Sequence, residues 1–260
     1  MDSAELIVNK EVPYIVQLTL NRPHQLNAWT LPLEAALFAA LDDAMSDPVA
    51  RVVVITGAGS GFCAGASMDM LGGAARPAAQ VRRRRLCELA EFPKPIIAAV
   101  NGAAAGLGFA LALWCDVRIC ANDAKLTAAF SRLGLVAEHG TAWLLPRLVG
   151  RARATDLLLS GRVLTGTEAF ELGLATRAVE RDQTLPEAMA YAQLLVDSGA
   201  PSSWRTIKGQ VNASDFSTMA EAYQASLELM EHALASADHR EGVQAWMEKR
   251  PPRFSAYPQG

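Results

Sequence analysis

The sequence predicts an α/β core followed by a C-terminal helical region, and two observations indicate this arrangement. Apolar runs of strand length alternate with amphipathic helical stretches up to residue 185, whereas residues 186–249 follow a helical pattern alone. Hydrophobic residues make up 51% of the 260-residue chain, enough to bury a substantial core. We therefore divide the chain into an α/β core of residues 1–195 and a helical region of residues 196–260.

The first elements already show this alternation. Residues 6–8 and 14–20 predict a pair of strands, because apolar residues alternate or run together there. Residues 27–45 predict an amphipathic helix, since apolar residues recur every four positions and Asp-Pro follows at 47–48. Residues 51–56, with the sequence RVVVIT, predict a buried parallel strand.

Residues 94–116 predict a strand, a tight turn and a helix in succession. The strand is the apolar run at residues 96–100, which Asn-Gly ends at residues 101–102. Small residues then lead into an apolar segment at residues 107–114, which predicts a helix. We expect the rest of the chain to be arranged around this unit.

The start of that helix is a candidate site for an anionic oxygen. If the helix begins near Gly106, the N–H groups of Leu107 and Gly108 lack intrahelical acceptors and lie at the positive end of the helix dipole. Glycine and alanine leave room for a substrate oxygen to approach the backbone, as in an oxyanion hole. Close packing of the helix against a neighbour is the alternative explanation of the same small residues.

The pattern continues with two short strands and three helices before the C-terminal region. The strands are predicted at residues 117–120 and 125–127. The helices are predicted at residues 141–149, 152–160 and 167–172, and glycine follows the last two, at Gly161 and Gly173.

Four consecutive arginines, Arg82 to Arg85, fall in a stretch for which we also predict a helix. A solvated helix face and a contact to a phosphate-bearing ligand are both consistent with them. Four successive helical residues cannot all face one ligand.

Composition excludes several classes of function. The formal net charge of −3 offers no electrostatic case for nucleic acid. The longest apolar stretches are interrupted by Asn101 and glycines, and the N-terminus lacks a basic-then-apolar signal, so we expect a cytoplasmic protein with no membrane partner. The four cysteines form no CxxC pair and have no histidine at metal spacing, so we expect reduced thiols and no metal.

Several ordered motifs resemble the crotonase superfamily, also called the enoyl-CoA hydratase/isomerase family. They are NRPHQLNAWT, GSGFCAGASMDML, KPIIAAVNGAAAGLGFALALWCDVRIC, GLVAEHGTAWLLPRLVG, LLLSGRVLTGTEAFELGLATRAV and EGVQAWMEKRPPRF. The resemblance implies a spiral of ββα units whose C-terminal helical region serves trimerisation and covers CoA. It also implies a homotrimer or a hexamer built as a dimer of trimers, acting on an acyl-CoA, with coenzyme A present as part of the thioester substrate.

The resemblance also assigns roles to individual positions. Two backbone N–H groups, those of Ala66 and Leu107, would hold the thioester carbonyl as it becomes an enolate. The loop from Ala64 to Ala66 would hold the adenine end of CoA. Phe254 matches an aromatic residue that packs on CoA from a neighbouring subunit, and Arg253 is a candidate for a phosphate contact there.

The departures from the family pattern bear on the reaction. The two glutamates that hydratases of the family use align with Ala110 and Phe130, neither of which can transfer a proton. Glu138 falls where dienoyl-CoA isomerases place a catalytic aspartate and chlorobenzoyl-CoA dehalogenases a nucleophilic one. We expect Glu138 to be the acid/base, with His139 as a secondary candidate beside it and Trp143 and Phe130 as candidate apolar neighbours.

Three alternatives stay open at this stage. Glu138 could instead satisfy free N–H groups at the start of the helix that follows it. A CoA-independent branch of the superfamily hydrolyses carbon–carbon bonds of diketones with histidine and acidic residues. A non-catalytic acyl-CoA binding protein would keep the fold and lose the paired acids, as Ala110 and Phe130 suggest.

Overall fold

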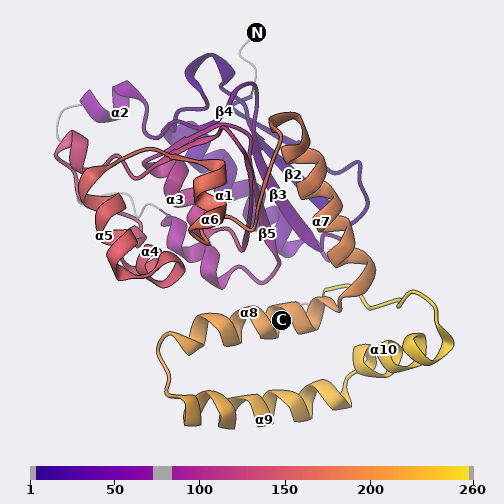
Figure 1. The fold of residues 1–260 in the computed structure, drawn as a ribbon. Coiled ribbons are helices and arrows are strands. Elements are labelled where there is room, and N and C mark those ends of the chain that lie inside the picture. The colour runs from indigo at the N-terminus through magenta and orange to yellow at the C-terminus, as the bar shows by residue number, and fades with distance from the viewer. Residues whose placement is uncertain (1–3, 73–83, 258–260) are drawn as a thin grey trace.

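The computed structural model describes residues 4–72 and 84–257 of the chain (Figure 1). Six strands form one sheet in the order β1-β2-β3-β5-β7-β10, parallel throughout except for the antiparallel β1–β2 pair. Their bounds are β1 Leu6–Asn9, β2 Ile15–Leu20, β3 Val52–Gly57, β5 Ile96–Val100, β7 Val117–Ala121 and β10 Arg177–Val179.

A second, smaller sheet has the order β4-β6-β8-β9, with β4, β6 and β8 parallel and β9 antiparallel to β8. Its bounds are β4 Gly61–Cys63, β6 Ala103–Ala105, β8 Lys125–Thr127 and β9 Leu164–Thr165. The successive pairs β3–β4, β5–β6 and β7–β8 each place one strand in the large sheet and the next in the small sheet. This repetition produces the spiral of ββα units.

Helices and short 3₁₀ turns connect and cover the sheets. The α-helices are α1 Leu31–Ser46, α2 Met68–Gly72, α3 Leu107–Trp114, α4 Thr141–Val149, α5 Arg151–Ser160, α6 Gly166–Glu171, α7 Thr184–Ser198, α8 Pro201–Ser214, α9 Met219–Ala235 and α10 Ala237–Glu248. The 3₁₀ turns are η1 Pro23–Gln25, η2 Leu86–Glu91, η3 Ser131–Leu133 and η4 Arg181–Gln183.

The large sheet separates two apolar layers. One face packs on α1, α3 and the small sheet, where residues such as Leu37, Phe62 and Phe109 are fully or almost fully buried. The opposite face packs on α7 through Ala188 and Ala192. Valine and isoleucine alternate between the two layers along β3, as expected for a strand covered on both sides.

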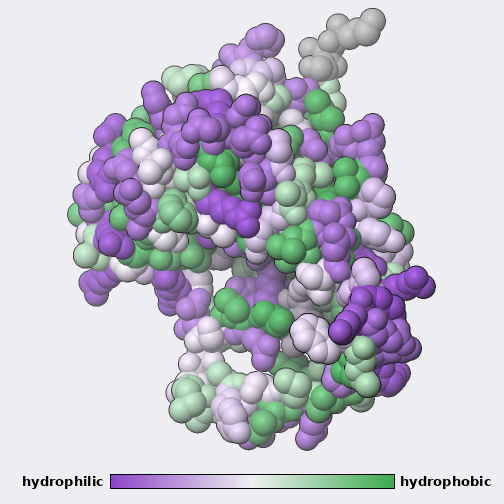
Figure 2. All heavy atoms as spheres, turned by 45° about the vertical axis from the view of Figure 1, so that its right-hand side comes forward, coloured by the Kyte–Doolittle hydropathy of each residue, from purple (hydrophilic) through white to green (hydrophobic). Residues whose placement is uncertain are grey.

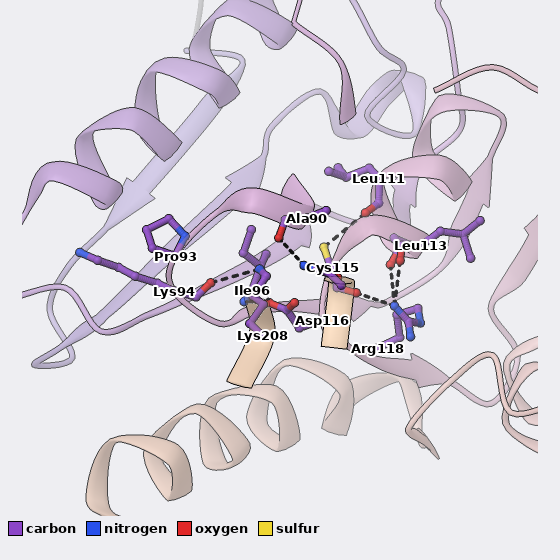
Figure 3. Close-up of polar contacts among 12 residues, drawn as sticks. Ala90, Pro93, Lys94, Ile96, Leu111, Leu113, Cys115, Asp116, Arg118 and Lys208 are labelled. Atoms are coloured by element: carbon purple, nitrogen blue, oxygen red, sulfur yellow. Dashed lines mark hydrogen bonds and ion pairs between the residues drawn. The ribbon is translucent and has the colours of Figure 1, made fainter. Parts of the chain in front are cut away.

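The C-terminal helices α8, α9 and α10 lie below the core in Figure 1. Helix α7 runs through residue 195 and still packs on the sheet, so α8 is the first helix of the chain beyond that layer. Lys208 on α8 donates to the Asp116 carboxylate at 2.9 Å, and that same carboxylate oxygen accepts the Ile96 N–H at 2.7 Å (Figure 3). The helical region is therefore bound to the core at the start of β5.

Several helices and strands match their expected bounds to within a residue or two, including β5, α3, β8 and α4. The helix expected at residues 27–45 begins later, at Leu31, because the Thr30 side chain accepts the Leu33 N–H and caps it. The prediction of a helix through the arginine run was wrong for Arg84 and Arg85, which precede the 3₁₀ turn η2 and belong to no helix; the backbone of Arg85 is extended. Arg82 and Arg83 lie outside the described residues.

Candidate active site

A cavity of about 300 Å³ opens at the carboxyl ends of the parallel strands β4, β6 and β8. Strands β4 and β8 contribute the three residues that directly follow them, 64–66 and 128–130, and β6 contributes its last residue and the next two, 105–107. Carboxyl ends of parallel strands are a common place for ligand sites, because the chain turns there and its backbone groups are free. The lining residues are Ala64, Gly65, Ala66, Met70, Leu71, Ala105, Gly106, Leu107, Ala128, Ala129, Phe130, Leu133, Leu135, Val136 and Glu138.

The N–H of Ala66 is directed away from its neighbouring strand segment. Ala66 forms an isolated parallel bridge with Trp29, in which the Trp29 N–H donates to the Gly65 carbonyl and the Ser67 N–H donates to the Trp29 carbonyl. Adjacent peptide groups in extended backbone point in opposite directions, so the Ala66 N–H faces the other side. Among the described residues it has no hydrogen-bond acceptor.

The N–H of Leu107 is the first of helix α3. Gly106 is the N-cap with φ 51° and ψ −112°, a conformation open to glycine, and the first intrahelical bond runs from the Ala110 N–H to the Gly106 carbonyl. Within residues 4–72 and 84–257 no acceptor binds the Leu107 N–H. Ala66 and Leu107, whose N–H groups we predicted to hold a thioester carbonyl together, therefore line the same cavity.

Glycines allow these two segments to approach each other. A Cβ on Gly65, whose φ is 95°, would lie 2.9 Å from the Ala105 carbonyl oxygen. A Cβ on Gly108 would lie 2.0 Å from the Cys63 carbonyl oxygen, so α3 rests directly on β4. Close packing thus explains Gly108, while Gly106 provides the turn that starts the helix.

Glu138 is the one residue with an ionisable side chain among those lining the cavity, within the part of the chain that the structure describes. Its backbone carbonyl accepts the Thr141 N–H at 3.1 Å and the Thr141 hydroxyl at 2.8 Å. Helix α4 begins after Gly140, and no side chain caps it. The alternative role of the Glu138 carboxylate as a helix-start cap is therefore not seen in the structure.

The secondary candidates differ in whether they line the cavity. Phe130 lines it, whereas Ala110 is buried inside α3. His139 does not line the cavity, and its Nδ1 accepts the Leu86 N–H at 3.2 Å. Trp143 also lies outside the lining, and its ring stacks on Trp114 and on Phe216.

Arg253 and Phe254 contact helix α10 and the residue before β3. Arg51, just before β3, donates to the Phe254 carbonyl at 3.0 Å, and the Phe254 ring packs near Gly242 of α10. The Arg253 N–H donates to Glu241 at 2.6 Å. These contacts are near the amino end of β3, so neither residue lines the cavity in this chain.

Part of the apolar lining was not anticipated from the sequence. It includes Leu133, Leu135 and Val136, which are exposed to 58%, 47% and 82%, respectively. A run of large apolar residues between two predicted elements, with no helix or strand pattern, was the available signal. Together with Met70 and Leu71 these residues favour a ligand with an apolar part.

Other reactive groups near the site are neutral or absent. Burial raises the pKa of Cys63, directly before the cavity loop, to about 12, so it is a thiol and not a thiolate nucleophile. No cluster of three or more metal-ligating side chains occurs in the described residues. Arg84 binds Asp42 and Glu88 on the surface and is not one of the residues that line the cavity. No helix within residues 4–72 and 84–257 is long and apolar enough to cross a membrane.

The fold and the cavity together define an α/β spiral protein in which Ala66, Leu107 and Glu138 line one cavity. The sequence model of the Enoyl-CoA hydratase/isomerase family matches residues 11–257, and the chain belongs to that family. The predicted family, α/β fold and C-terminal helical region are confirmed. The chain is accordingly an enzyme of the hydratase/isomerase type.

Known proteins resemble the chain over nearly its whole length. The 1,2-epoxyphenylacetyl-CoA isomerase of Escherichia coli K12 is 37% identical over 96% of this chain and 98% of its own length. The crystal structure of an enoyl-CoA hydratase from Bacillus anthracis matches with a TM-score of 0.89 at 32% identity, covering 96% and 99% of the two chains. A Polaromonas sp. JS666 enoyl-CoA hydratase gives the same TM-score, identity and coverage.

Proposed function

We propose that the protein is an acyl-CoA isomerase that moves a carbon–carbon double bond with a single carboxylate. The observation that carries the proposal is that Glu138 is the sole ionisable side chain of the described cavity lining, and that Ala66 and Leu107, the residues of the two backbone donors, line the same cavity. A double-bond shift needs one group that removes a proton from one carbon and returns it to another. One carboxylate can perform both steps.

The reaction would start with the thioester carbonyl oxygen between the N–H groups of Ala66 and Leu107. These donors stabilise the negative charge that develops on the oxygen when the Glu138 carboxylate removes a proton from the carbon next to the carbonyl. A 3-enoyl thioester thereby becomes a dienolate. Glu138, now protonated, returns the proton to the far carbon, giving the 2-enoyl thioester and restoring the carboxylate.

Hydration needs more groups than this cavity offers. Adding water to a double bond requires one base to activate the water and one acid to protonate the carbon beside the carbonyl. The positions that resemble those of the family's paired glutamates hold Ala110, which is fully buried, and Phe130. The proposal therefore favours isomerisation over hydration.

The substrate class follows from the relatives and from the lining. The named substrate of the Escherichia coli relative is a CoA thioester, and its name is that of an isomerase. We propose a CoA thioester for this chain as well, with the apolar side chains of Met70, Leu71 and Leu135 around the acyl group. The loop at Ala64 would then lie toward the adenine end of CoA.

We also propose that the chain forms a homotrimer or a dimer of trimers through its C-terminal helices. Met219 on α9 and Trp246 and Met247 on α10 are exposed to 83%, 86% and 77%, and Figure 2 shows apolar residues on the lower, C-terminal part of the molecule. Large exposed apolar residues of this kind favour contact with another subunit. A neighbouring copy would also allow Arg253 and Phe254 to reach CoA.

The test is turnover of 2-enoyl-, 3-enoyl- and dienoyl-CoA thioesters by the wild-type protein and by Glu138→Gln, with Glu171→Gln as the matched control at an exposed position. We expect Glu138→Gln to lower kcat by about 10²–10⁴-fold while the Kd for the thioester stays close to the wild-type value. The control variant should keep wild-type turnover.

Other outcomes would select the alternatives. Thioester binding without turnover in either protein would indicate a binding protein, for which Ala110 and Phe130 are the supporting observation. Cleavage of a diketone without affinity for CoA would indicate the hydrolase. Full activity in Glu138→Gln would exclude the proposed acid/base.

A further inference from the structure

The turn that carries Glu138 has an unusual backbone conformation at the next residue. His139 has φ 52°, in the left-handed region that non-glycine residues seldom adopt, at a cost of roughly 1–2 kcal/mol. Gly140 follows with φ 75°. Such a conformation persists where surrounding contacts enforce it, and those contacts can be identified here.

Two hydrogen bonds hold His139, one at its backbone carbonyl and one at its imidazole ring. The indole N–H of Trp114 donates to the His139 carbonyl at 2.6 Å, and the imidazole Nδ1 accepts the Leu86 N–H at 3.2 Å. Trp114 is the last residue of α3, the helix whose first N–H is that of Leu107. The same short helix therefore bears one proposed donor at its first residue and fixes the Glu138 turn from its last.

The Trp114 ring is fixed in turn by packing. A Cβ on Gly140 would lie 2.8 Å from the ring, so the indole lies directly against the turn and the position requires glycine. Trp143 stacks on Trp114 with ring centroids 6.2 Å apart, and Phe216, just beyond α8, stacks on Trp143 at 5.3 Å. The indole N–H thus has little freedom to leave the His139 carbonyl.

We propose that Trp114 and His139 are positioning residues for Glu138, holding the 138–140 turn so that the carboxylate faces the cavity. The inference rests on the proposed function of Glu138. It assigns no proton transfer to His139, because the ring lies outside the cavity lining and its Nδ1 is engaged as an acceptor. Loss of either contact should let the turn relax and displace the carboxylate.

The main variant is Trp114→Phe, which keeps an aromatic ring for the stack and removes the indole N–H. A displacement of about 1 Å at a catalytic group can lower turnover by about 100-fold, so we expect kcat to fall by roughly 10- to 100-fold. The Kd for the acyl-CoA should stay within about two-fold, because the backbone donors and the apolar lining are untouched. Trp204→Phe, which makes the same change in α8 away from the cavity, is the matched control.

A second pair of variants does not depend on the tryptophan. His139→Asn keeps an acceptor close to the place of Nδ1 and tolerates left-handed backbone, whereas His139→Ala loses the acceptor. We expect Asn to retain turnover within a few-fold of wild type and Ala to resemble Trp114→Phe. Equal turnover in the Asn and Ala variants would contradict a positioning role for the ring.

A double-mutant cycle with Glu138→Gln separates positioning from general loss of stability. If Trp114 acts through Glu138, adding Trp114→Phe to Glu138→Gln should change the residual turnover by less than about two-fold. The same loss in both backgrounds would overturn the inference, as would wild-type kcat in Trp114→Phe. Full turnover in Glu138→Gln alone would instead overturn the proposed function, and the positioning role with it.

Discussion

Substitution of Gly108 by alanine tests whether the contact between α3 and β4 holds the two proposed backbone donors, the N–H groups of Ala66 and Leu107, in place. Gly108 is the second residue of α3, next to Leu107, and a Cβ there would lie 2.0 Å from the Cys63 carbonyl oxygen and 2.7 Å from the Cys63 Cβ. An ordinary contact is about 3.5 Å, so α3 and β4 must separate by more than about 1 Å. Neither atom belongs to a flexible side chain that can move aside.

The displacement acts on both sides of the proposed oxyanion hole. Ala66 follows β4 and Leu107 starts α3, so separating the two elements moves one N–H away from the other. Loss of one such donor costs about 10²–10³-fold in kcat, and overpacking costs about 1–3 kcal/mol of stability. We expect Gly108→Ala to show both effects, measured as turnover of an enoyl-CoA and as the free energy of unfolding in urea.

The matched control is Gly209→Ala, the same change within helix α8. No atom lies within 4 Å of the place of its Cβ, and alanine is favoured over glycine in a helix by about 0.5–1 kcal/mol. This variant should be slightly more stable than wild type and fully active. Wild-type turnover and stability in Gly108→Ala would refute the proposed dependence of the site on the contact between α3 and β4.

Three further predictions concern groups outside the cavity. A thiol reagent should modify Cys87 alone in the native protein, because burial raises the pKa of each of the other three cysteines, Cys63, Cys115 and Cys120, to about 12. Reaction of a second thiol before the protein unfolds would contradict this. Burial lowers the pKa of Lys94 from 10.5 to about 8, so the unfolded chain binds more protons between those pH values. The difference in free energy of unfolding between wild type and Lys94→Met, measured by urea titration, should therefore increase with pH between about 8 and 10.5, by up to about 1.4 kcal/mol per pH unit. A difference that stays constant or falls over this range would contradict the prediction. Arg118→Met should cost at least about 3 kcal/mol in the same assay, because the buried guanidinium donates to the carbonyls of Leu113 and Cys115 at the end of α3 (Figure 3). It also donates to the Leu174 carbonyl, and a loss below about 1 kcal/mol would argue against this role.

Much of the fold was predictable because local patterns and tertiary structure agree. The strand at β5 and the helix at α3 are set by an apolar run, an Asn-Gly break and small residues, and packing preserves those bounds. The three-residue strand β6 between them was not predicted. It pairs with β4 and β8, whose sequences give no local sign of that pairing.

Part of the site could be predicted because its residues lie in sequence motifs that resemble those of the family. Family motifs indicated Ala66, Leu107 and Glu138, and the structure brings all three to one cavity, although their roles stay proposals. The setting of Glu138 depends on contacts between distant segments. Trp143 is close in sequence yet stacks on Trp114 and Phe216, and sequence spacing alone does not reveal which side of α4 it takes.

The central claim is that one carboxylate and two backbone donors perform isomerisation. The most direct measurement is the ratio of two rates for the wild-type protein: conversion of a 3-enoyl-CoA to the 2-enoyl-CoA, and hydration of that 2-enoyl-CoA to the 3-hydroxyacyl-CoA. The account predicts measurable isomerisation with hydration slower by about 100-fold or more, since the second acid/base is absent. Hydration as fast as isomerisation would contradict it.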